Sequence, residues 1–103
     1  MPIYFNVPDV REFLLDNGVV FTLRKPRSEG ETYAVVGSYC KHKTIAIVRV
    51  KLEKTDIHYA EDLGPYFSQS GLVGCSVYDW FELAKKMSGE TLNLYKVTLV
   101  EKI

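Results

Sequence analysis

The hydrophobic positions of this chain follow a two-residue period most clearly over residues 44–52. Side chains of a strand point alternately to its two faces, so this stretch predicts a strand with one apolar face. The apolar run over residues 31–39, rich in Tyr and Val, predicts a partner strand. Residues 40–43 form a short polar connection between the two. We therefore expect an antiparallel hairpin with Lys41, His42 and Lys43 at its tip.

Further strands are predicted over residues 2–5, 19–24 and 92–100. In the second of these, Phe21 and Leu23 share one face, which we expect to pack into the core. Thr22 and Arg24 share the other face. This strand therefore places a hydroxyl and a guanidinium side by side, next to a hydrophobic core.

Two segments carry a helical period instead. The first is predicted to begin with a capping pair of Asp9 and Glu12 and to end at about Asp16, before Gly18. The second begins with the pair Ser76 and Asp79 and ends at residues 88–89. Its apolar stripe, which we expect to be core, consists of Val77, Trp80, Phe81, Ala84 and Met87.

The segment between the hairpin and the second helix is irregular. Residues 55–63 are compatible with a helical turn, which Gly64 and Pro65 are expected to stop, and a loop should follow over residues 68–74. Together these elements predict a single α+β domain over residues 1–103. Its sheet should be a small curved sheet or β-barrel of about five to six strands, closed by two main helices.

The formal net charge is zero, but the charges are distributed unevenly. Residues 24–51 hold seven lysines and arginines against two glutamates, whereas residues 53–90 are net acidic. This asymmetry predicts one surface that faces an anion. Cys40 and Cys75 are too few for a disulfide framework or a zinc site, so we expect reduced thiols, no metal and no cofactor. No apolar run is long enough to span a bilayer, and we expect a cytoplasmic protein without a membrane partner.

The candidate binding residues come from this basic half and from nearby aromatic and turn residues. Arg24 is suited to holding a phosphate, although an ion pair with an acid such as Asp79 is an equal alternative. Tyr66 is a candidate platform for an unpaired base, and Ser70 brings backbone amides near a ligand; the alternatives are core packing and a plain turn. A groove for a nucleic-acid backbone, or simply solvated charges, would be formed by Lys25, Arg27, Lys41 and Lys43.

The order of these motifs resembles the ASCH domain. The resemblance lies in the strand Phe21-Thr22-Leu23-Arg24, in Ser70-Gly71-Leu72 ahead of the helix around Trp80, and in residues 94–97. It implies a PUA-like β-barrel associated with RNA. We therefore expect a cleft between residues 22–27, residues 65–72 and the start of the second helix. Its ligand would be a single-stranded RNA or a nucleotide, bound by a monomer or a weak homodimer.

One branch of that family removes the acetyl group from N4-acetylcytidine with a lysine, a threonine and a glutamate. In this chain Thr22 matches the threonine, Val19 replaces the lysine, and Asp79 stands in the position of the glutamate. A valine cannot accept the proton of a threonine nucleophile. Hydrolysis of a modified nucleoside, or of RNA, therefore stays the alternative, and it requires that Lys25 or Lys43 reach the site.

Overall fold

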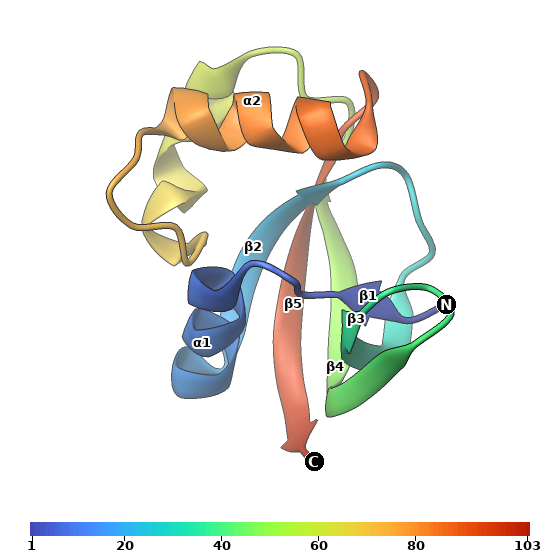
Figure 1. The fold of residues 1–103 in the computed structure, drawn as a ribbon. Coiled ribbons are helices and arrows are strands. Elements are labelled where there is room, and N and C mark those ends of the chain that lie inside the picture. The colour runs from blue at the N-terminus through green and yellow to red at the C-terminus, as the bar shows by residue number, and fades with distance from the viewer.

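The computed structural model describes all residues, 1–103, as one α+β domain (Figure 1). Its elements are β1 (Ile3–Tyr4), α1 (Pro8–Asn17), β2 (Val19–Arg24), β3 (Gly30–Gly37), β4 (His42–Lys54), the 3-10 helix η1 (Ala60–Gln69), α2 (Val77–Ser88) and β5 (Asn93–Lys102). Both predicted helices and all five predicted strands are present. In Figure 1, α2 crosses one end of the sheet and α1 lies beside β2.

The five strands form one sheet in the order β1-β3-β4-β5-β2. β1 runs parallel to β3, and the other neighbours are antiparallel. β1 and β2 are the two edges and do not pair with each other, so the sheet is a half-barrel. Of the two predicted forms, the curved sheet is present and the closed β-barrel is not. β1 contains only two residues before the chain turns into α1, which leaves too little extended backbone to pair with β2.

The hairpin is confirmed, with β3 and β4 paired antiparallel. Its turn is formed by residues 38–41 and not by residues 41–43, because His42 and Lys43 already pair with Gly37 and Val36. Its end is tied to the connection between β1 and α1. The Asn6 side chain donates to the Gly37 carbonyl and accepts from the Gly37 amide, both at 2.8 Å. The Tyr4 hydroxyl lies 3.4 Å from Nδ1 of His42. These contacts hold residues 4–6 in place opposite β2.

The core consists of two clusters on opposite faces of the sheet. The first packs α1 and β1 against one face through Leu14, Phe5, Val20 and Tyr95. The second packs η1 and α2 against the other face, and it contains Phe21, as predicted. β2 contributes to both clusters because its residues alternate between the two faces. The face of β2 that carries Thr22 therefore also packs against other elements. The sequence pattern predicted burial only for the face that carries Phe21 and Leu23.

Two predicted helix boundaries are also wrong. α1 begins at Pro8 with Val7 as its N-cap, so Asp9 lies inside the first turn and makes no capping pair. Proline fits the first helical position because the missing N–H has no intrahelical partner there. At the other end Gly18 is left-handed (φ 79°) and its N–H bonds to the Leu14 carbonyl, as expected.

The second error concerns η1, which continues through Pro65 to Gln69 instead of stopping at Gly64. Leu63 is completely buried in the second cluster, and Tyr66 and Phe67 pack against that cluster. Burial of these side chains outweighs the lost hydrogen bond of the proline. Tertiary packing, rather than local propensity, therefore determines the length of this helix.

The cap of α2 is the pair that the sequence predicts. Oγ of Ser76 accepts from the Asp79 amide at 3.3 Å, and Oδ2 of Asp79 accepts from the Ser76 amide at 2.9 Å. The predicted apolar stripe is buried at Trp80 and Ala84, but Met87 is 66% exposed. Met87 lies in the last turn, beyond the second cluster, which explains its exposure.

Replacing Ser76 by alanine should lower the free energy of unfolding by about 1 kcal/mol, the usual value of a lost N-cap. Urea unfolding followed by circular dichroism measures this. Ser28→Ala is the matched control, because the Ser28 hydroxyl is exposed and only the Ser28 carbonyl makes a hydrogen bond. Equal stabilities of the two variants would contradict a capping role for Ser76.

Candidate functional site

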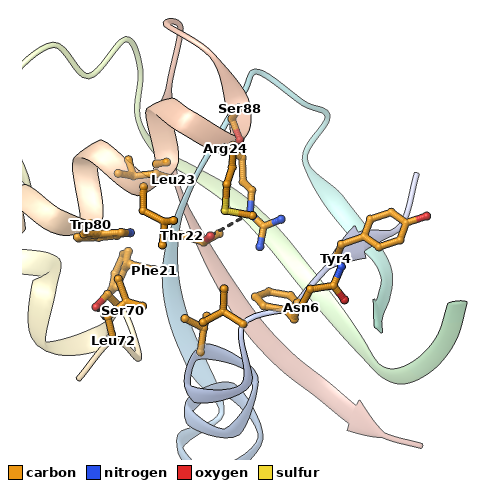
Figure 2. A pocket seen from close by; sticks show the side chains of 16 residues that line it. Tyr4, Asn6, Phe21, Thr22, Leu23, Arg24, Ser70, Leu72, Trp80 and Ser88 are labelled. Atoms are coloured by element: carbon orange, nitrogen blue, oxygen red, sulfur yellow. Dashed lines mark hydrogen bonds between the residues drawn. The ribbon is translucent and has the colours of Figure 1, made fainter. Parts of the chain in front are cut away.

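A cavity of about 120 Å³ lies at the open side of the half-barrel. It is enclosed by residues 4–7 after β1, by residues 21–24 of β2, by residues 70–72 and by one face of α2. Its wall is mostly apolar. The polar side chains that line it are few, namely Asn6, Thr22, Arg24, Ser70 and Ser88, besides Tyr4 and the indole of Trp80 (Figure 2).

Arg24 is the charged residue of this cavity. Its Nε donates to Oγ1 of Thr22 at 3.0 Å, and its guanidinium lies over the Phe5 ring, 5.2 Å from the centroid. Neither partner carries a charge. The three ion pairs of the structure lie elsewhere, so the alternative of an ion pair between Arg24 and Asp79 is wrong. Asp79 instead caps α2.

The two terminal nitrogens of Arg24 make no hydrogen bond, and they face accessible space, because no side-chain nitrogen or oxygen is fully buried without a partner. Burial, with a smaller effect of the nearby Arg27, lowers the pKa of Arg24 to about 10. The guanidinium is therefore still charged at neutral pH. A partly buried cation without an acid partner favours an anionic ligand.

Thr22 is buried, with its hydroxyl in contact with Arg24. No lysine, histidine, aspartate or glutamate lines the cavity, so no side chain beside Thr22 can accept its proton. Asp79 is exposed, and so are Lys25 and Lys43. The structure thus brings Thr22 together with Arg24, and it does not bring Thr22 together with Asp79 or with either lysine.

The other predicted binding residues separate into two groups. Ser70 lines the cavity, and its Oγ accepts from the Leu72 amide at 3.2 Å. Tyr66 lies outside the cavity and packs on Phe21, with a centroid distance of 4.9 Å. Lys25, Lys41 and Lys43 are exposed and do not line it.

Arg27 has a structural role. It donates to the Met1 carbonyl at 2.8 Å and to the Ser28 carbonyl at 3.3 Å, which ties the loop after β2 to the start of the chain. Burial lowers its pKa. Two of its three nitrogens thus donate to backbone carbonyls. None of Lys25, Arg27, Lys41 and Lys43 lines the cavity, so the predicted groove is not part of its wall.

Several residues of the cavity were not predicted. Phe5 and Asn6 reach it because the hairpin holds their segment against the open side of the sheet. Trp80 was expected in the core, where it is indeed 5% exposed, but it also lines the cavity. An apolar stripe marks which side of a helix is buried, and it does not show whether the buried side meets a cavity.

Comparison of the chain with models of protein families, with curated proteins and with solved structures gave no match. None of the helices in the structure has the length and apolar character needed to cross a membrane.

Proposed function

We propose that this protein binds a nucleotide, either free or as an unpaired residue of single-stranded RNA. The base enters the cavity and the phosphate meets Arg24. The observation that carries this proposal is the guanidinium of Arg24, which is partly buried, charged and without an acid partner. Arginine presents a planar fork of donors that matches phosphate oxygens.

The size and polarity of the cavity support a base as the inserted group. This cavity has a volume of about 120 Å³, slightly below the roughly 150 Å³ of a cavity that binds benzene. It therefore accepts the edge of a planar base, with the rest of the base, the sugar and the phosphate outside. Aromatic side chains in its wall, Phe5, Phe21 and Trp80, suit a base removed from its stack.

As part of this proposal, the protein is an ASCH-like domain with a PUA-like architecture, and it acts in the cytoplasm. This assignment is supported by Thr22, Arg24 and Ser70, three of the residues that carry the resemblance, because all three line the same cavity. The free thiols Cys40 and Cys75 suit a reducing compartment. For a hydrolase, in contrast, the cavity supplies no base beside Thr22.

Isothermal titration calorimetry with nucleoside monophosphates and with the matching nucleosides tests this proposal. Each monophosphate should bind about 10- to 100-fold more tightly than its nucleoside, since a hydrogen bond to a charged group contributes about 1.5–3 kcal/mol. Added salt should weaken the binding of the monophosphate more than that of the nucleoside. A short single-stranded RNA, titrated in parallel, shows whether the nucleotide is bound free or within a strand.

Two results would contradict the proposal. One is the absence of binding by every nucleotide and RNA tested. The other is equal affinity for nucleoside and monophosphate, which would leave Arg24 without a phosphate to bind.

A further inference from the structure

Trp80 presents an unused hydrogen-bond donor to the cavity. The side chain comes from the first turn of α2, is 5% exposed and lies in the second core cluster. Its indole N–H makes no hydrogen bond, yet no side-chain nitrogen is fully buried without a partner. The indole nitrogen therefore borders accessible space, and Figure 2 shows it at the end of the ring that faces Thr22.

A buried tryptophan usually satisfies its N–H, because an unpaired buried donor is costly. Packing alone would be served as well by phenylalanine. The free N–H of Trp80 therefore points to a ligand that completes it, in the same way as the free guanidinium nitrogens of Arg24. In Figure 2 the two groups lie on opposite sides of Thr22.

The remaining polar side chains of this part of the cavity are also donors. The Thr22 oxygen already accepts from Arg24, and the Ser70 oxygen already accepts from the Leu72 amide. The hydroxyl protons of both have no acceptor among the side chains. No carboxylate or imidazole lines the cavity, and the acceptors among its side chains are the neutral oxygens of the hydroxyls and of Asn6. The terminal N–H groups of Arg24 and the indole N–H of Trp80 bond to none of them, so a ligand that contacts both residues must bring acceptors.

We infer that Trp80 determines specificity by donating its N–H to a carbonyl oxygen of the base. This inference rests on the proposed nucleotide binding. Uracil, cytosine and guanine each carry an exocyclic oxygen, whereas adenine carries only an exocyclic amine. The acceptors of adenine are ring nitrogens. In the pose that sets an exocyclic oxygen of the other bases against Trp80, adenine brings its amine, a second donor, and leaves both groups unpaired. The site thus selects nucleotides with an oxo group on the base.

The test is calorimetry with the 5′-monophosphates of uridine, cytidine, guanosine and adenosine on the wild-type chain and on Trp80→Phe. The wild type should bind at least one of the three oxo nucleotides about tenfold more tightly than AMP. Trp80→Phe keeps an aromatic ring and removes the N–H. It should weaken the preferred oxo nucleotide by about five- to tenfold and leave AMP unchanged, so that the selectivity is lost.

A second measurement uses the indole nitrogen-proton resonance of the wild-type protein, and it decides the question if Trp80→Phe does not fold. Trp80 is the only tryptophan, so its indole N–H gives a single nitrogen-proton resonance. Saturation with the preferred oxo nucleotide should move this resonance downfield, as expected for a newly formed hydrogen bond. Phe67→Leu is the control variant, because Phe67 packs near Trp80, 6.1 Å between ring centroids, and does not line the cavity. It should retain the selectivity.

The outcomes separate the two levels of the proposal. AMP that binds as tightly as the oxo nucleotides, an unshifted indole resonance at saturation, or full selectivity in folded Trp80→Phe overturns the role of Trp80 while nucleotide binding stands. If no nucleotide binds to the wild type at all, the proposed function itself fails.

Discussion

Replacing Arg24 by methionine is expected to remove nucleotide binding and to stabilise the unliganded protein. Arg24 holds a cation in a mostly apolar cavity with no acid to balance it. Loss of the charged contact to phosphate should lower affinity about 100-fold. An apolar side chain of similar volume avoids the desolvation of the guanidinium, which should raise the free energy of unfolding by about 1 kcal/mol.

The sign of this stability change follows from the pKa. Burial lowers the pKa of Arg24 to about 10, well below the ordinary value of an arginine, so folding disfavours the charged form. The unfavourable contribution is therefore present throughout the neutral range, and it is relieved only as the pH rises through about 10. The expected gain of about 1 kcal/mol is what remains after the guanidinium loses its contacts with Phe5 and Thr22. The cation–π contact alone accounts for about 0.5–1 kcal/mol of that loss.

Calorimetric titration and urea unfolding at pH 7 measure the two effects of Arg24→Met. Arg49→Met is the matched control, because the Arg49 side chain is 65% exposed and pairs with Glu31 outside the cavity. It should change neither quantity by much. If Arg24→Met instead loses stability and keeps its affinity, Arg24 supports the fold and does not bind the ligand.

Gly71→Ala should be the most destabilising small substitution at the site, with a loss of about 2–4 kcal/mol. Gly71 is left-handed (φ +81°), and an added Cβ would lie 2.8 Å from Cα of Val10 and 2.9 Å from Cβ of Phe13. Because Cα of Val10 belongs to the backbone of α1, it cannot move aside easily. The segment 70–72 would be pushed away from α1, which should also weaken ligand binding, since Ser70 and Leu72 line the cavity.

Gly74→Ala separates the two causes of this loss. Gly74 has a similar φ of +70° but no atom within 4 Å of the added Cβ. It should therefore lose only the conformational part, about 1–2 kcal/mol, and retain ligand affinity. Thermal and urea unfolding of both variants give the comparison. Equal losses in Gly71→Ala and Gly74→Ala would show that the contact with α1 relaxes without cost.

Local signals in the sequence were accurate where neighbouring residues decide the structure. The Ser76 and Asp79 cap involves residues three apart, and the stop at Gly18 requires only a left-handed residue. The alternation over residues 44–52 also survives, with Ala46, Val48 and Val50 buried. These features depend on backbone geometry and short-range hydrogen bonds, which the order of residues specifies.

Signals failed where distant packing competes with local preference. Gly64 and Pro65 are strong helix breakers, yet burial of Leu63 keeps η1 intact. The two edges of the sheet stay apart, although apolar residues on both faces of some strands suggested closure. Strand pairing across the sheet depends on the length of β1 and on how the hairpin holds residues 4–6, and neither can be read from periodicity.

By itself the sequence determined an α+β domain with its hairpin, its two main helices, and a strand that places Thr22 beside Arg24. Only the tertiary structure decided which groups share the cavity. It separated Arg24 from Asp79, committed Arg27 to backbone carbonyls, and turned the N–H of Trp80 toward Thr22. The physical reason is that a charge or donor acquires a binding role only when it lacks a partner. Partners come from segments far apart in the chain.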